Sequence, residues 1–171
     1  MKTYIIMGVA GCGKSTIGRE AAKRLNIPFL EGDDFHPQAN VEKMSSGIPL
    51  CDDDRLPWVD LMVQACKDRA SNQNSEKNVI ILACSALSKT VRERLRKGLN
   101  QHCHFIHLHG DKDKIEQRLA DRKGHFFKAD LLASQFEALE IPQNADRLDI
   151  FQPINVLADQ LCAIIQLENE A

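Results

Sequence analysis

The sequence predicts an α/β protein in which helices cover both faces of a parallel β-sheet. Short apolar runs rich in β-branched residues alternate along the chain with longer segments of helical period, and this alternation is typical of units with parallel strands. One run, Val79-Ile80-Ile81-Leu82, is apolar throughout, as expected of a central parallel strand that is buried on both faces. Ligands of such sheets bind at the carboxyl ends of the strands, so the residues that follow each strand are candidates for a site.

Four runs qualify as strands, and a fifth run, residues 147–150, is a poor strand candidate. The four runs are residues 4–7, 28–30, 79–82 and 105–108. Apolar residues three or four positions apart mark the helices, and one helix is expected to run from about Leu56 into the polar stretch at 71–78. The positions that mark the other helices are Ile17, Ala21 and Leu25; Val41 and Met44; Val91, Leu95 and Leu99; Ile115 and Leu119; Leu132, Phe136 and Leu139; and Leu157, Leu161 and Ile164 or Ile165.

The bulk composition fits one globular domain that spans residues 1–171. Hydrophobic residues make up 43% of the chain and charged residues 27%, which separates it from disordered sequences. The formal net charge of −2 offers no broad positive field for nucleic acid or an anionic membrane surface, and no apolar run approaches the length of a membrane helix. The six cysteines are scattered without a C-x-x-C pair, which favours reduced thiols in a cytoplasmic protein.

Residues 8–15 match the phosphate-binding motif G-x-x-x-x-G-K-[ST] without a substitution. Glycines let such a loop curl until its backbone N–H groups point at a phosphate, and the helix that follows adds its positive end. The lysine of the motif reaches the β- and γ-phosphates, and its hydroxyl residue binds Mg²⁺. The predicted nucleotide-binding residues are Gly8, Gly11, Cys12, Gly13, Lys14, Ser15 and Thr16.

The alternative for this motif is a glycine-rich turn that binds nothing. The loop has an apolar strand before it and a periodic helix after it, which is the context that the binding motif requires. The guanine-reading sequence N-K-x-D is absent, because no asparagine in the chain is followed by lysine. ATP is therefore favoured over GTP.

Acidic residues follow the second expected strand, in the segment Glu31-Gly32-Asp33-Asp34-Phe35-His36-Pro37. A carboxylate at this edge can accept a proton from a hydroxyl that attacks the γ-phosphate, or it can hold Mg²⁺. The alternative is a helix N-cap, because aspartate caps helices well and proline suits the first helical turn. One aspartate can cap the helix while the other does the chemistry, so both interpretations stay open.

A second polar string, residues 49–58, combines three aspartates with Arg55 and a rigid Pro57-Trp58 pair. Three acids in a row are usually a solvated surface. Arginine binds carboxylates bidentately, and aspartates accept hydrogen bonds from hydroxyls. The string therefore also suits a substrate that carries one carboxylate and several hydroxyls.

Arg118 and Arg122 are four residues apart and would share one face of a helix. Gly124 and an aromatic pair follow, so the two arginines lead into a glycine-hinged segment. Such a segment suits a mobile lid whose cations stabilise the transferring phosphoryl group and whose closure excludes water. A basic, solvated helix face is the alternative.

Two further features look reactive without predicting a site. The four histidines between 102 and 109 would point to opposite faces of a strand, so they do not form a tetrahedral metal-binding set. Cys84 ends the central strand, but phosphoryl transfer needs no covalent intermediate and buried cysteine is common.

Three strings in the chain resemble the gluconate kinase family. They are GDDFHPQANVEKMSSGIPLCDDDRLPW at 32–58, ACSAL at 83–87, and RKGHFF with LLASQFEALE between 122 and 140. With the phosphate loop they cover most of the chain through about Pro142. The resemblance implies a three-layer P-loop kinase fold with a lid at about 122–130. It also implies phosphorylation of D-gluconate to 6-phosphogluconate with ATP and Mg²⁺, usually in a homodimer.

The same resemblance implies roles for individual residues. The implied catalytic residues are Lys14, Asp33 and Arg122, and the implied metal ligands are Ser15 and Asp33. The implied substrate-binding residues are Asp33, His36, Lys43, Arg55, Ser85, His125 and Gln135. On the nucleotide side, Arg118 would stack on adenine, Arg122 would reach a phosphate, and Gln152 and Pro153 would lie near the base.

The chain departs from the family pattern after the third strand. The family commonly has a string like A-L-K-x-x-Y-R there, and this sequence has Ser88 and Val91 in place of the lysine and the tyrosine. Two rival functions stand beside gluconate phosphorylation: a kinase for another hydroxy-acid such as shikimate, and a nucleotide-binding protein without turnover. The strings around His36 and at 52–58 argue against shikimate, and a protein without turnover would leave the strings of Asp33 and Arg55 without a purpose.

Overall fold

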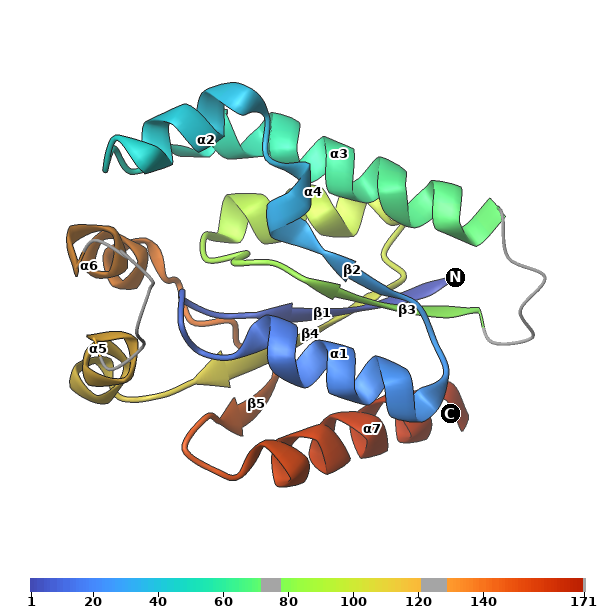
Figure 1. Cartoon of the computed structure of the whole chain (residues 1–171). Helices are drawn as coiled ribbons and strands as arrows, with labels where there is room; N and C mark the ends of the chain where they lie inside the picture. The colour runs from blue at the N-terminus through green and yellow to red at the C-terminus, as the bar shows by residue number, and fades with distance from the viewer. Residues whose placement is uncertain (72–77, 121–128, 171) are drawn as a thin grey trace.

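The computed structural model describes residues 1–71, 78–120 and 129–170, and it confirms the predicted α/β architecture (Figure 1). Within these ranges five parallel strands form one sheet in the order β2-β3-β1-β4-β5. The strands are β1 (Lys2–Met7), β2 (Phe29–Glu31), β3 (Val79–Ala83), β4 (Cys103–His109) and β5 (Asp146–Asp149). The helices are α1 (Lys14–Leu25), the short 3-10 helix η1 (Gly32–Phe35), α2 (Gln38–Ser45), α3 (Asp52–Ser71), α4 (Lys89–Gly98), α5 (Lys112–Ala120), α6 (Ala129–Ala138) and α7 (Ile154–Glu170).

Helices cover both faces of the sheet, with α3 and α4 on one side and α1 and α7 on the other (Figure 1). Side chains of the central strand β1 enter both cores. Tyr4 and Ile6 pack in the core shared with α1 and α7, whereas Ile5 and Met7 pack in the core shared with α3 and α4. Burial on both faces explains why β1 and β3 read as continuous apolar runs. In the described ranges, no helix combines the length and the apolar character needed to cross a bilayer.

The carboxyl edge of the sheet is bordered by three helical regions. Figure 1 shows α5 and α6 beyond the ends of β1 and β4. η1 follows directly on β2 and leads into α2 on the α3 side of the sheet. Segments that are far apart in the sequence therefore meet at the edge where parallel sheets bind their ligands.

The fifth strand corrects the sequence prediction. Residues 146–149 form β5, which pairs in parallel with β4, although Leu148 alone among its four residues is buried. β5 lies at the edge of the sheet and has one neighbouring strand. Charged residues are tolerated on such a strand because its outer side faces water, so a weak apolar pattern did not exclude it.

The start of α3 is a second correction, because the helix begins at Asp52 and not at about Leu56. The backbone N–H of Cys51 donates to the carboxylate of Asp54 at 3.0 Å, and the carbonyl of Cys51 accepts the N–H of Arg55 at 3.2 Å. This arrangement closes the first turn in the manner of a capping box. The consecutive aspartates lie in that turn, where the positive end of the helix stabilises them.

Candidate active site

The phosphate loop joins β1 to α1 at the carboxyl edge of the sheet. Gly11 and Gly13 have φ angles of 78° and 95°, in the left-handed region that favours glycine, so the chain turns sharply before Lys14 begins the helix. Among the described residues no side chain caps the start of α1, and its first turn contains no acid. The free N–H groups and the positive end of the helix are therefore available to an anion.

Contacts with the neighbouring strand ends fix the loop in place. The N–H of Gly8 donates to the carbonyl of Ser85 at 3.4 Å, and a side chain at position 8 would lie 2.6 Å from the carbonyl oxygen of Leu108. The loop is thus packed between the ends of β3 and β4. The ammonium of Lys14 donates to the carbonyls of Gly8 and Val9, both at 3.0 Å, and is held against the loop.

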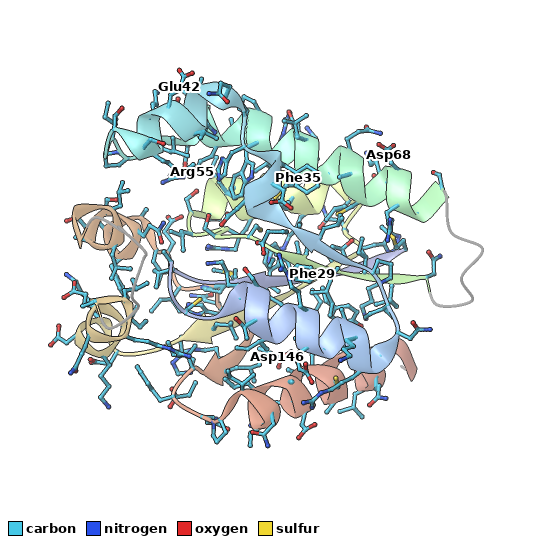
Figure 2. All side chains as sticks on the ribbon, viewed as in Figure 1. Phe29, Phe35, Glu42, Arg55, Asp68 and Asp146 are labelled. Carbon is cyan, nitrogen blue, oxygen red and sulfur yellow. The ribbon has the colours of Figure 1, made fainter. Side chains whose placement is uncertain are left out.

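A cavity of about 710 Å³ extends from this loop toward η1, α2 and the start of α3. The predicted site residues that line it are Gly11, Gly13, Lys14, Ser15, Thr16, Asp33, His36, Arg55, Ser85 and Gln135. Figure 2 labels Arg55 near the start of α3, on the side of the carboxyl edge. Groups predicted for the phosphates and groups predicted for the acceptor therefore share one space.

Asp33 lies in η1, directly after β2, and its exposed side chain lines the cavity. The structure does not use an aspartate as the cap of the next helix. α2 begins at Gln38 with Pro37 at the N-cap position, and no side-chain hydrogen bond caps it. Of the two interpretations of this segment, the capping role for Asp33 or Asp34 is wrong, and Asp33 is free to serve the cavity.

His36 is held in place by buried neighbours, and one of them, Trp58, also lines the cavity. Its imidazole stacks on the indole of Trp58, whose Nε1–H donates to the carbonyl of Gly32 at 2.7 Å. The side-chain amide of Asn40 lies 3.4 Å from His36 Nδ1 and donates to the carbonyl of Asp54 at 2.8 Å. Trp58 and Asn40 are both buried, so the orientation of the imidazole is set by packed neighbours.

Burial lowers the pKa of His36 below its ordinary value, while Asp33 raises this pKa and Arg55 lowers it. The imidazole is therefore neutral at neutral pH and suited to hydrogen bonding with a hydroxyl. The charges of Asp33 and Arg55 both act on the pKa of His36, so the three side chains lie near one another. Because all three line the cavity, they could contact the same bound molecule.

Lys43 is placed differently from the other predicted acceptor residues. Its ammonium lies 2.5 Å from the carboxylate of Asp54. This bond raises the pKa of Lys43, and together with the N–H of Cys51 it lowers the pKa of Asp54 to about 2. Lys43 is not among the residues that line the cavity, and its ion pair ties α2 to the first turn of α3.

Gln135 contacts the phosphate loop itself. Its Oε1 accepts the backbone N–H of Ala10 at 2.6 Å. Gln135 comes from α6, so this bond joins α6 to the nucleotide side of the cavity. The family resemblance implied a substrate contact for this residue, and the structure adds a direct contact with the loop.

A second cavity, of about 560 Å³, lies between α5 and the segment that follows β5. Arg118 and Gln152, which the family resemblance places near the nucleotide base, both line it. Phe151 and Lys114 also line it, and the Lys114 ammonium lies 5.1 Å from the centre of the Phe151 ring. An aromatic face beside two cations is a suitable surface for a planar base.

Some predicted residues join neither cavity. The buried side chain of Cys12 packs into the core on the α1 side of the sheet. The carbonyl of Pro153 accepts the N–H of Leu157 at 3.1 Å, at the start of α7. Arg122 and His125, with most of the predicted lid at 122–130, lie outside the described residues.

Sequence reasoning missed Asn40, Lys114 and Phe151 as site residues. Asn40 had no signal in the sequence pattern, because His36 is extended and precedes α2, so their contact is not a helical neighbour pair. Phe151 had a signal, because it lies in the loop at about 149–153 that the family resemblance places near the base. Lys114 had none, because the fold brings it to Phe151 from a distant segment.

The histidines of β4 and Cys84 have structural surroundings. His104 Nε2 lies 2.6 Å from the carboxylate of Asp146, and His107 is buried within the sheet. Among the described residues, no group of three or more His, Cys, Asp or Glu side chains could hold a metal ion. Cys84 is fully buried, and burial raises the pKa of its thiol well above the ordinary value, which keeps it protonated.

Comparisons with known proteins agree with this geometry. The family model described as "Shikimate kinase" matches residues 10–147. The thermoresistant gluconokinase of Escherichia coli K12 is 49% identical over 147 residues, covering 86% of this chain and 81% of the relative. A gluconokinase structure from Sinorhizobium meliloti 1021 superposes with a TM-score of 0.78 at 33% identity, covering 98% of this chain and 97% of the other. An unliganded sugar kinase from Janibacter sp. HTCC2649 reaches a TM-score of 0.86 at 36% identity, covering 97% and 95%.

Proposed function

The chain belongs to the gluconokinase family of shikimate-kinase-like P-loop kinases, and from this membership we propose that it transfers the γ-phosphoryl group of ATP to D-gluconate, giving 6-phospho-D-gluconate and ADP. One observation carries the proposal: the phosphate loop and the Asp33, His36 and Arg55 side chains line a single cavity. In that cavity an acceptor hydroxyl and the terminal phosphate can approach each other without a covalent intermediate.

The acceptor half of the cavity suits a hydroxylated carboxylate. The guanidinium of Arg55 offers paired N–H donors to a carboxylate, and the neutral imidazole of His36 offers a hydrogen bond to a hydroxyl. Asp33, at the carboxyl end of β2, would orient the attacking hydroxyl and accept its proton. Ser85, which follows β3 and lines the cavity, would add a further hydroxyl contact.

The nucleotide half of the cavity suits the phosphates of ATP. Lys14 would move from the carbonyls of the loop to the β- and γ-phosphate oxygens, and the N–H groups at the start of α1 would receive the β-phosphate. The second cavity, with Arg118 and Gln152, would receive the adenine. Arg122, His125 and Lys43 keep their assignments as predictions from the family resemblance.

The residues present also fit a bound Mg²⁺. Ser15 and Asp33 supply a hydroxyl and a carboxylate oxygen to the same cavity, and these are ligand types that Mg²⁺ prefers. When bound, Mg²⁺ neutralises charge on the phosphate oxygens. A homodimer and a cytoplasmic location also remain predictions.

A coupled assay of ADP release tests the proposal. With Mg·ATP, the wild-type chain should turn over with D-gluconate and show only background rates with shikimate or without an acceptor. Asp33→Asn should lower kcat by about 10²- to 10⁴-fold, the range for loss of a general base. Asp34→Asn is the matched control, because this neighbouring aspartate does not line the cavity, and it should retain wild-type rates.

Each other outcome has a definite meaning. Turnover with shikimate alone would keep the fold and refute gluconate as the acceptor. Nucleotide binding without acceptor-dependent turnover would favour the non-catalytic rival. Equal losses of kcat in Asp33→Asn and Asp34→Asn would refute the proposal that Asp33 is the general base.

A further inference from the structure

Arg55, which lines the cavity, is hydrogen-bonded to the carboxylate of Asp52, which is not among the lining residues. Nη1 of Arg55 donates to Oδ1 of Asp52 at 3.1 Å, one turn earlier in α3. The side chain of Arg55 is 16% exposed and that of Asp52 is 37% exposed. Among the described residues Arg55 belongs to the cavity lining and Asp52 does not, so Asp52 is placed to act on a bound molecule through Arg55.

The same oxygen of Asp52 also accepts a hydrogen bond from α4. Ser88 Oγ lies 3.1 Å from Asp52 Oδ1. Ser88 is the N-cap of α4, and its Oγ accepts the N–H of Val91 at 3.3 Å. A hydroxyl has one proton to donate and lone pairs to accept with, so Ser88 can cap α4 and donate to Asp52 at once. Its single proton is thereby directed at Asp52.

Hydrogen bonds thus connect Ser88 at the start of α4, through Asp52, to Arg55 in the cavity. We propose that Ser88 and Asp52 are positioning residues that fix the Arg55 guanidinium for an acceptor carboxylate. The inference rests on the proposed function for the identity of the acceptor, and it goes beyond it in naming what orients the arginine. The N-cap of a helix is anchored by its backbone, so Ser88 gives Asp52 a fixed partner that solvent would not provide.

The expected sizes of the effects on stability and on acceptor binding distinguish a positioning role for Asp52 from a purely structural one. An ion pair with partly exposed partners contributes little to the stability of a fold, so the Asp52 contacts are not needed to hold α3 together. Orientation of a charged donor instead acts on binding, where a single hydrogen bond to a charged group changes affinity by about tenfold. Loss of the hydrogen bonds from Ser88 through Asp52 to Arg55 should therefore raise KM for the acceptor. It should leave Tm and KM for ATP almost unchanged.

Three single variants test the inference first, by steady-state kinetics with D-gluconate and Mg·ATP. Ser88→Gly removes the hydroxyl, while glycine at an N-cap costs only a few tenths of a kcal/mol in helix stability. It should raise KM for D-gluconate by about three- to tenfold, with kcat and KM for ATP within about twofold of wild type. Ser88→Thr keeps the hydroxyl and should restore wild-type KM. Ser71→Gly, at the far end of α3, is the matched control and should have no effect.

A double-variant cycle tests whether Ser88 acts through Asp52. Asp52→Ala should raise KM for D-gluconate by at least as much as Ser88→Gly. Adding Ser88→Gly to Asp52→Ala should then change KM by less than about twofold, because the hydroxyl has lost its partner. Independent, multiplying effects in the double variant would overturn the inference, as would a wild-type KM in Ser88→Gly.

An acceptor-free measurement separates failure of this inference from failure of the proposed function. In the wild-type protein without ligands, a fixed guanidinium should give separate ¹⁵N NMR signals for the two Nη groups of Arg55. These signals should merge in Ser88→Gly and stay separate in Ser88→Thr. If the wild type fails to phosphorylate D-gluconate, the proposed function falls, yet this comparison still decides the positioning role. Merged Nη signals in the wild type would overturn it.

Discussion

The His36 imidazole and the Trp58 indole lie face to face, with ring centroids 4.4 Å apart and planes 10° from parallel. One ring belongs to the segment after β2 and the other to α3, so the stack joins the two sequence strings that supply the acceptor half of the cavity. Trp58 is 1% exposed, and its Nε1–H also holds the carbonyl of Gly32 at the start of η1. A single buried side chain thus supports the positions of both His36 and Asp33.

Substitutions at Trp58 should separate the effect of its stack on His36 from the effect of its hydrogen bond to Gly32. Trp58→Phe keeps an aromatic face for His36 but loses the hydrogen bond to Gly32, and it should raise KM for D-gluconate by only a few-fold. Trp58→Leu also loses the stack and leaves a cavity in the core, so it should lower the free energy of unfolding by about 2–4 kcal/mol and raise KM further. Urea unfolding and acceptor titrations measure the two effects. Identical KM values in both variants would argue against a role for the stack.

The pKa of His36 should respond in opposite directions to its two charged neighbours. Asp33 raises this pKa and Arg55 lowers it, beneath a larger lowering by burial. Asp33→Asn should therefore move the titration midpoint of His36 to lower pH, and Arg55→Gln should move it to higher pH. NMR of the imidazole ring protons between pH 4.5 and pH 8 provides the measurement. Shifts of the same sign in both variants would contradict the arrangement of the three side chains.

His107 should make the stability of the fold depend on pH. It is 3% exposed, its Nδ1 has no hydrogen-bond partner among the described residues, and burial lowers its pKa to about 4 from an ordinary 6.5. Because the folded pKa lies below the unfolded one, the unfolded chain binds the proton more readily. This contribution to stability is complete above about pH 6.5 and is lost as pH falls toward 4, with a maximum of about 3 kcal/mol.

His107→Phe should reduce this acid sensitivity. The difference in free energy of unfolding between pH 7.5 and pH 4.5, measured in urea at constant ionic strength, should shrink by about 1–3 kcal/mol in this variant. His102→Gln is the matched control, because His102 is exposed. An unchanged difference in His107→Phe would show that His107 is not the responsible group.

Gln135 should affect the nucleotide more than the acceptor. Its Oε1 accepts the N–H of Ala10 in the phosphate loop. Gln135→Leu removes this acceptor and should raise KM for ATP by about two- to tenfold, while KM for D-gluconate changes less. Gln135→Glu keeps an acceptor oxygen but brings a negative charge toward the phosphates, so its KM for ATP should rise at least as much. A larger effect on D-gluconate in both variants would place Gln135 with the acceptor, as the family resemblance implied.

The parts of this protein that sequence could predict are those whose cause is local. The phosphate loop follows from glycines at fixed spacing, and the buried run at 79–82 followed from burial on both faces. β5 was not predicted, because an edge strand is defined by its neighbour and needs little apolar pattern of its own. The start of α3 was placed too late, because the cap involves Cys51 and Asp54, which read as part of a solvated acidic run.

The candidate site shows the same division. Asp33, His36 and Arg55 follow strands or begin helices at the expected edge, so their meeting in one cavity was predictable from position. The ion pair of Lys43 with Asp54 was not, because the two residues come from separate helices, α2 and α3. The family resemblance assigned Lys43 to the acceptor, and in the structure its ammonium meets the carboxylate of Asp54.

The strand order has a consequence for how this enzyme can diversify. The acceptor half comes from the ends of β2 and β3, the phosphate loop follows the central β1, and the second cavity lies beside α5 and β5, toward the other edge. The proposed sites for acceptor, phosphates and base would therefore follow one another along the sheet in the order of the strands. We expect mutations that exchange one hydroxy-acid for another to gather mainly within 32–58, away from the phosphate loop that follows β1.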